Sequence, residues 1–210
     1  MRSPRQIDSP WRLAVLISGS GRSLRNLLDA IAAGELNAEV VTVVSSAADV
    51  RGLQIAAAAG IPTHILKPSD AKGIDAYSTA TYQILQPYKP DLVIMAGYLR
   101  RLLVHPGWEN RSLNIHPALL PQAASYAAGR GFYGDRVHAA VLDHGDEESG
   151  ATVHVVTDEY DDGPPLAQSV VPVLPGDDVR ALAERVFAAE CELDPRVIRD
   201  YMTLHPELKR

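Results

Sequence analysis

The sequence contains a single cysteine, Cys191, which excludes an internal disulfide framework and indicates a reducing compartment. No apolar run approaches the ~20 residues of a membrane-spanning helix, so we expect no membrane association. Basic residues are not in excess, because 20 Lys and Arg stand against 26 Asp and Glu, and the formal net charge is -6. This balance argues against nucleic acid as a partner but allows a local cationic pocket. No apolar core follows Arg2 and Arg5, so we predict no secretory signal and a cytoplasmic protein.

The length and composition are typical of one soluble globular domain. The chain has 210 residues, of which 46% are hydrophobic and 22% are charged, and a chain of this size can bury a full core. We expect an N-terminal tail over residues 1–11, the domain over residues 12–205 and a C-terminal tail over residues 206–210. No internal repeat, low-complexity tract or linker interrupts this domain.

The first motif is a buried strand that leads through a loop of small residues into a helix. Residues 13–17 are continuously apolar, and leucine and isoleucine recur at helical spacing over residues 24–31. Between them, Gly21, Arg22 and Ser23 stand where a helix N-terminus offers N–H groups to an anion, and we predict a phosphate site. The alternative is a plain tight turn in which Ser23 caps the helix. The loop is neither a Walker loop nor a full dinucleotide fingerprint.

Strands and helices alternate along the next part of the chain. Strands are expected over residues 38–44, 63–66 and 91–95, and helices over residues 50–59 and 75–85. This alternation predicts an α/β fold of the Rossmann-like type. We expect a doubly wound, mostly parallel sheet with helices on both faces, in a single domain.

Residues 112–121 are predicted to form a short strand that ends abruptly at two prolines. Asn114 and His116 would lie on the same face of this strand. An amide beside an imidazole suits acyl-transfer or proton-transfer chemistry, and the alternative is a polar strand end that only satisfies the following turn. Gly21 and Gly97 also follow predicted strands, and ligands of such sheets bind at the C-terminal ends of strands. That agreement favours the functional interpretation.

The loops that follow are the least regular part of the sequence. Residues 122–134 are rich in Gly and Ala and are expected to form a long loop over the site. His138 and His154 are expected to be structural. The remaining elements are expected to be a helix from Asp135 to Gly145, strands over residues 151–157 and 166–173, a helix from residue 177 or 178 to residue 193, and a closing helix over residues 195–204.

Two charged clusters are candidates for ligand contact. Residues 158–162 include four carboxylates, but a calcium loop needs ligands at alternate positions and a distant glutamate. We therefore expect no metal here and one carboxylate directed at a partner. Arg100 and Arg101 follow a predicted strand, and they either meet an acidic ligand group or are ordinary surface arginines.

Five segments occur in the order found in folate-dependent formyltransferases. They are Ser-Gly-Ser-Gly at 18–21, Met-Ala-Gly-Tyr-Leu-Arg at 95–100, Asn-Ile-His-Pro-Ala-Leu-Leu-Pro at 114–121, Gly-Ala-Thr-Val-His at 150–154 and Asp-Asp-Gly-Pro at 161–164. Over residues 12–205 the chain resembles the phosphoribosylglycinamide formyltransferases of purine synthesis. The third segment is a specific signature of the folate-dependent formyltransferases. The other segments and the chain length favour the phosphoribosylglycinamide formyltransferases among them.

The resemblance implies transfer of a formyl group from the co-substrate 10-formyltetrahydrofolate to the amine of glycinamide ribonucleotide, N1-(5-phosphoribosyl)glycinamide, without a metal. It also implies a cis peptide bond between Leu120 and Pro121. The residues implied are Asn114, His116 and Asp161 for catalysis; Gly21, Arg22, Ser23 and Glu190 for the ribonucleotide and its phosphate; and Leu99, Arg100, Arg101, Leu102, Asn114, Thr157, Asp158, Glu159, Tyr160 and Asp161 for the folate.

The implied residue types suit direct attack by the amine. Negative charge grows on the formyl oxygen, and the Asn114 amide and a protonated His116 can both donate to it. His116 can then protonate the departing folate nitrogen. We expect Asp161 to raise the pKa of His116 by ion pairing and to accept the proton that the amine loses.

The chain also departs from the family pattern. Ser23 replaces the usual Asn, Asp162 replaces the usual Gly, and residues 122–125 replace a Pro-Gly or Gly-Gly pair in a longer loop. Alternatives are therefore a formyltransferase for another amino sugar nucleotide, a formyltetrahydrofolate hydrolase, or a non-catalytic folate- or nucleotide-binding relative. We expect neither the extra N-terminal domain of the hydrolases nor the C-terminal domain of the methionyl-tRNA formyltransferases. A homodimer is an open alternative to a monomer.

Overall fold

A single mixed sheet organises the computed structural model, which describes residues 9–129 and 131–210. Residues 1–8 of the expected N-terminal tail lie outside the described residues. The strands are β1 (Trp11–Ile17), β2 (Ala38–Ser45), β3 (Thr63–Ile65), β4 (Leu92–Met95), β5 (Ser112–His116), β6 (Glu148–Val155) and β7 (Pro165–Pro172). The α-helices are α1 (Arg22–Ala32), α2 (Arg51–Ala58), α3 (Ile74–Leu85), α4 (Ala124–Ala127), α5 (Asp135–His144) and α6 (Val179–Leu204). Short 3-10 turns are η2 (Pro68–Asp70), η3 (Gln86–Tyr88) and η4 (Pro206–Leu208).

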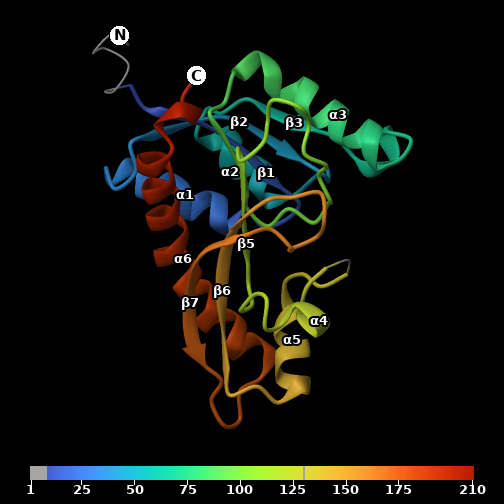
Figure 1. The fold of residues 1–210 in the computed structure, drawn as a ribbon, viewed down its shortest axis with the longest axis vertical. Helices are drawn as coiled ribbons and strands as arrows, with labels where there is room; N and C mark the ends of the chain where they lie inside the picture. Colours follow the sequence, from blue (N-terminus) through green and yellow to red (C-terminus); the bar gives the residue numbers. More distant parts are fainter. Residues whose placement is uncertain (1–8, 130) are drawn as a thin grey trace.

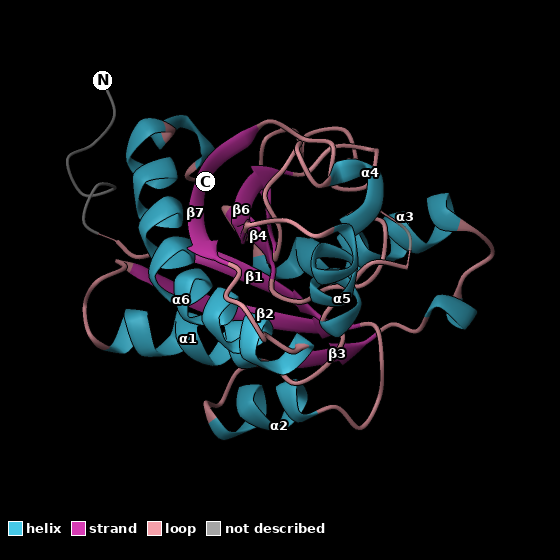
Figure 2. Ribbon diagram, turned by 90° about the horizontal axis from the view of Figure 1, so that it is seen from below, coloured by secondary structure: helices cyan, strands magenta, loops and turns pink. Residues whose placement is uncertain are grey.

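The sheet is mostly parallel, as predicted. Its seven strands follow the order β3-β2-β1-β4-β5-β6-β7, and the pairings from β3 to β5 are parallel. The last two pairings, of β6 with β5 and of β7 with β6, are antiparallel. Figure 2 shows helices on both sides of the strands. The α/β class, the doubly wound arrangement and the single domain are thereby confirmed.

β1 is buried on both faces, which explains its continuous apolar sequence. Leu13, Val15 and Ile17 pack with residues of α1 and α6 on one face. Ala14 and Leu16 pack with residues of α3 on the other face. All five side chains are fully buried, so hydrophobic burial fixes β1 at the centre of the fold.

The C-terminal helix α6 corrects one expectation. Separate helices were expected on either side of residue 194, but α6 is one helix of 26 residues with Pro195 inside it, and it runs alongside β6 and β7 (Figure 1). A proline has no N–H to give to the carbonyl four residues earlier. The Cys191 carbonyl instead accepts a hydrogen bond from Asn26 Nδ2 at 3.0 Å. Like every other helix in the described part of the chain, α6 is not both long and apolar enough to cross a membrane.

The expected long loop between β5 and α5 is more ordered than its composition indicated. Its residues 124–127 form the single turn α4, and Ala123 and Ala127 are buried in a cluster with residues of α5 and α6. Small side chains allow this close packing, whereas the Gly- and Ala-rich composition had predicted only a long loop. The Leu120–Pro121 peptide bond before it is cis, as the resemblance implied.

Residues 206–210, which were expected to be a tail, lie against the domain. Leu208 in η4 belongs to the same apolar cluster as β1. The Arg210 backbone N–H donates to Asp91 Oδ1 at 2.6 Å. Burial and hydrogen bonding thus hold this end of the chain in place.

Candidate active site

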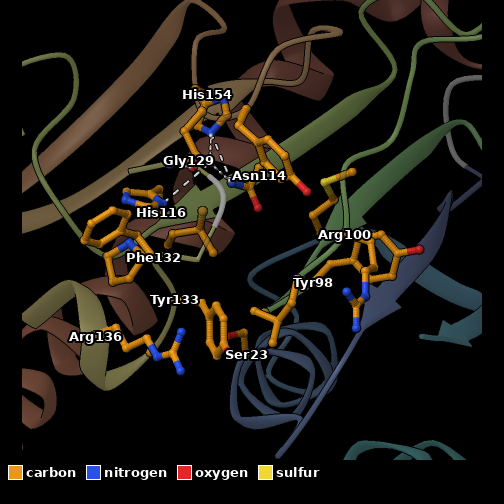
Figure 3. A pocket seen from close by; sticks show the side chains of 18 of the residues that line it. Ser23, Tyr98, Arg100, Asn114, His116, Gly129, Phe132, Tyr133, Arg136 and His154 are labelled. Carbon is orange, nitrogen blue, oxygen red and sulfur yellow. Dashed lines mark hydrogen bonds and ion pairs between the residues drawn. The ribbon is translucent and has the colours of Figure 1, made fainter. Parts of the chain in front are cut away.

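A cavity of about 470 Å³ opens where several strands of the sheet end (Figure 3). Parallel strands present their C-terminal ends at one edge, which is why loops distant in sequence meet there. The lining comes from the start of α1, the loop after β4, the end of β5, the segment before α5, the loop after β6 and the middle of α6. Nearly every residue implied by the family resemblance lines this cavity; Gly21 and Asp158 do not.

Asn114, His116 and Asp161 form the centre of the cavity wall. Asn114 and His116 project from alternate positions of β5, and Asp161 lies in the loop after β6 with φ of 52°. Asn114 Nδ2 donates to Asp161 Oδ1 at 3.3 Å, and His116 Nδ1 lies 3.5 Å from the same oxygen. The structure therefore brings the three predicted catalytic residues together. Figure 3 labels two of them, Asn114 and His116.

The backbone of the segment before α5 holds two of these side chains. The Ala127 carbonyl accepts from His116 Nε2 at 2.8 Å, so this nitrogen carries a hydrogen. The Gly129 N–H donates to Asp161 Oδ2 at 2.9 Å. Both nitrogens of His116 thus face oxygen acceptors, and only the protonated ring satisfies both contacts.

Asp161 raises the pKa of His116, as expected, but burial reverses the net shift. Burial, with only 4% of the residue exposed, lowers the pKa of His116 below its ordinary value, while Asp161 and the Ala127 carbonyl raise it by less. Sequence reasoning named the carboxylate but not the burial, which depends on the whole fold.

Asp161 is held as a carboxylate. Burial raises the pKa of Asp161, but the neighbouring His154 and His116 side chains and the Gly129 N–H together lower it below its ordinary value. A negative charge is therefore kept beside the His116 ring at neutral pH.

His154 belongs to the site, although it was expected to be structural. It is the cross-strand partner of Asn114 on β6, and its Nε2 lies 3.1 Å from Asn114 Nδ2 and 3.7 Å from Asp161 Oδ1. Its Nδ1 lies 3.0 Å from the Val155 carbonyl, which fixes the Nδ1–H tautomer and leaves Nε2 as an acceptor. The antiparallel register that creates this pair is not readable from either strand alone.

His138 also lines the cavity. Burial lowers the pKa of His138 to about 4, so the ring is neutral at neutral pH. Its Nδ1 is buried without a hydrogen-bond partner among the residues described.

The start of α1 forms one end of the cavity. Gly21 stands at the N-cap position with φ of 72°, and a Cβ there would come within 2.5 Å of the Gly52 Cα. Gly21 therefore shapes the turn, while Arg22 and Ser23 line the cavity. No side chain caps the helix, so the alternative role of Ser23 as N-cap is wrong.

A second group of residues reaches this end from α6. The Arg22 guanidinium carbon lies 3.6 Å from the centre of the Phe187 ring. Burial and the nearby Asp194 raise the pKa of Glu190 to about 8, although Arg22 opposes the rise. Glu190 is therefore mostly uncharged at neutral pH and can donate as well as accept a hydrogen bond.

The opposite end is built by the loops after β4 and β6. Arg101 Nη2 donates to Glu159 Oε1 at 3.0 Å, and the Arg101 N–H donates to the Tyr160 hydroxyl at 3.1 Å. Asp158 Oδ1 accepts from the Val104 N–H at 2.7 Å, so Asp158 ties the loops together rather than lining the cavity. The other predicted folate contacts line it, namely Leu99, Arg100, Arg101, Leu102, Asn114, Thr157, Glu159, Tyr160 and Asp161.

The described residues contain no group of three or more His, Cys, Asp or Glu side chains placed to hold a metal ion. Hydrogen-bond donors and titratable groups are the chemical resources that the cavity offers.

Comparison with known proteins gives consistent matches. The sequence model of the formyl transferase family matches residues 11–198. Phosphoribosylglycinamide formyltransferase of Escherichia coli K12 is 38% identical over 89% of this chain and 84% of its own length. The trifunctional purine biosynthetic protein adenosine-3 of Drosophila pseudoobscura pseudoobscura is 38% identical over 94% of this chain, which spans 14% of that protein.

Solved structures agree with these matches. The glycinamide ribonucleotide transformylase 1 of Symbiobacterium toebii superposes with a TM-score of 0.80 and 39% identity, over 90% of this chain and 86% of that one. The phosphoribosylglycinamide formyltransferase of Brucella melitensis has a TM-score of 0.79 and 39% identity, over 92% and 96% of the two chains.

Proposed function

The chain belongs to the formyl transferase family, and we propose that it transfers a formyl group from 10-formyltetrahydrofolate to the amine of N1-(5-phosphoribosyl)glycinamide. The relatives named phosphoribosylglycinamide formyltransferase support this choice of reaction. One observation carries the proposal. Asn114, His116 and Asp161 meet in a single cavity between a helix start suited to a phosphate and a pair of loops suited to a larger ligand.

We assign the two ends of the cavity to the two substrates. The ribonucleotide phosphate would bind at the start of α1, where Arg22 supplies a charge and Ser23 a hydroxyl beside free N–H groups. The uncharged Glu190 would hydrogen-bond the ribonucleotide. The folate would lie against Leu99–Leu102 and residues 157–161, and its formyl group would then lie next to Asn114.

The chemistry starts with attack of the neutral amine on the formyl carbon. The formyl oxygen, which gains negative charge, would accept hydrogen bonds from Asn114 Nδ2 and His116 Nδ1. The contacts of these two nitrogens with Asp161 are long, at 3.3 and 3.5 Å, so both can turn to the substrate. That negative charge favours the protonated His116 ring, which burial alone disfavours. His116 would then protonate the folate nitrogen as the C–N bond breaks, and Asp161 would take the proton that the amine loses.

The assay follows tetrahydrofolate released from 10-formyltetrahydrofolate with and without the glycinamide ribonucleotide. Amine-dependent release supports the proposal, amine-independent release indicates a hydrolase, and no release indicates a binding protein. Release that requires a different amino sugar nucleotide would identify another acceptor.

Two variants test the roles of the central residues. His116→Ala and Asp161→Asn should each lower turnover by more than about a hundredfold with folding intact. His205→Ala is the matched control, because His205 pairs with Glu207 at the C-terminal end of the chain and should leave turnover unchanged. Near-normal turnover in either central variant would remove that residue from the mechanism.

The cellular setting is a separate proposal. We place the enzyme in the cytoplasm because the single cysteine suits a reducing compartment. Monomer and homodimer remain alternatives, and sedimentation equilibrium of the purified protein distinguishes them.

A further inference from the structure

A short segment of this chain supplies two backbone groups to the catalytic pair. We propose that residues 122–129, called the positioning segment below, orient His116 and Asp161, and that Tyr126 is the side chain that anchors the segment. This inference deepens the proposed formyl transfer and rests on it. The segment begins where the sequence departs from the pattern of the family that it resembles, with Gln122-Ala123-Ala124-Ser125 in place of a Pro-Gly or Gly-Gly pair.

The two backbone contacts are complementary in direction. The Ala127 carbonyl accepts from His116 Nε2 at 2.8 Å, and the Gly129 N–H donates to Asp161 Oδ2 at 2.9 Å. The first contact fixes the hydrogen on Nε2 and leaves Nδ1 to face Asp161 Oδ1 and the cavity. The second contact occupies Asp161 Oδ2 and leaves Oδ1 for Asn114 and His116. A shift of the segment would therefore disturb both catalytic groups at once.

The segment needs an anchor because its own helical turn is too short to be stable alone. Helix α4 has four residues, and a single turn fixes more dihedral angles than its hydrogen bonds repay. Ala123 and Ala127 are buried against α5 and α6, but methyl groups bury little apolar surface. Additional side-chain contacts must hold the segment in place.

Tyr126 provides those contacts. Its hydroxyl donates to Asp146 Oδ2, and its ring stacks on His144 with centroids 3.9 Å apart and planes 9° apart. His144 Nδ1 in turn lies 2.7 Å from Asp146 Oδ1. His144 ends α5 and Asp146 lies two residues beyond it, so the anchor joins the segment to a packed helix. Such a group, removed from the reacting atoms, acts by holding other residues.

The test replaces Tyr126 by Phe, which keeps the stacking ring and removes the hydroxyl. We expect kcat to fall about tenfold while KM for each substrate changes less than about twofold, because orientation of the catalytic pair is lost and substrate binding is not. Tyr88→Phe is the matched control. It removes a tyrosine hydroxyl that contacts His64 Nε2 at 2.8 Å, outside the cavity, and kcat should equal that of the unmodified protein.

A spectroscopic measurement separates positioning from stability. In protein labelled with ¹⁵N-histidine, the signal lost in His116→Gln identifies His116, and its Nε2–H proton should be protected from exchange. That proton should exchange faster in Tyr126→Phe and be unchanged in Tyr88→Phe. If Tyr126→Phe fails to fold, Asp146→Asn is the milder variant, with an expected loss in kcat of about threefold.

The outcomes are distinguishable. An inactive unmodified protein would refute the proposed function, yet the Nε2–H measurement would still test the positioning. Unchanged kcat and unchanged Nε2–H exchange in Tyr126→Phe, or equal losses in Tyr126→Phe and Tyr88→Phe, would overturn the inference.

Discussion

Asp194 should make the stability of this protein depend on pH. Its side chain lies on α6 one turn beyond Glu190, is 3% exposed, and its Oδ2 has no hydrogen-bond partner among the described residues. Burial raises the pKa of Asp194 from 3.8 to about 7. Between these values the folded protein binds a proton that the unfolded chain has released. Folding stability from this group is therefore fully present below pH 3.8 and is lost as pH rises through 7.

The magnitude follows from linkage. Between the two pKa values, each rise of one pH unit lowers the free energy of unfolding by about 1.36 kcal/mol. The rise from pH 5 to pH 7 therefore lowers it by about 3 kcal/mol. Asp194→Asn is never charged and escapes this loss. Relative to the unmodified protein, the free energy of unfolding of Asp194→Asn should therefore rise by about 3 kcal/mol between pH 5 and pH 8.

Urea unfolding followed by circular dichroism at pH 5 and pH 8 measures this difference. Asp200→Asn is the matched control, because Asp200 is exposed on the same helix. Its effect on the free energy of unfolding should be equal at the two pH values. Asp194→Asn could instead change the free energy of unfolding by the same amount at pH 5 and pH 8. Asp194 would then already be ionised in the folded protein at pH 5, and the predicted pH dependence would be refuted.

Three further substitutions test individual contacts. Gly21→Ala should lower the free energy of unfolding by more than about 2 kcal/mol, because its Cβ would meet the Gly52 backbone; an unchanged urea midpoint would contradict this. Asn26→Ala should cost about 1 kcal/mol in the same measurement, because the Cys191 carbonyl loses its donor, and no loss would mean that water replaces the bond. Arg22→Ala should raise KM for the ribonucleotide about tenfold or more with little change in KM for the folate; equal rises would remove Arg22 from the phosphate site.

The parts of the fold that follow from local sequence were predicted correctly. The apolar run of β1 and the abrupt end of β5 reflect burial on two faces and the two prolines, and both effects act within a few residues. The antiparallel pairing of β6 depends on a distant strand and was not predicted. Pro195 appeared to separate two helices, because the Asn26 side chain that satisfies the freed carbonyl lies far away in the sequence.

The same distinction holds in the site. Asn114 and His116 are two positions apart, so strand geometry alone placed them on one face. The role of Asp161 was implied only by the family resemblance, and the structure places its carboxylate beside His116. His154 was missed because its register against Asn114 is non-local. Asp161 raises the pKa of His116 as expected, but the larger lowering by burial was missed because burial is a property of the whole packed cavity.

The opposing influences on His116 give a last prediction. Burial lowers the pKa of His116, and the carboxylate 3.5 Å from Nδ1 is the largest influence that raises it. Removing that charge in Asp161→Asn should therefore lower the pKa of His116 further. Titration of the His116 ¹⁵N signals measures the shift, with His205, which lies outside the cavity, as internal reference. An unchanged or higher pKa of His116 in Asp161→Asn would mean that Asp161 does not stabilise the protonated ring, and its role as partner of the general acid would fall.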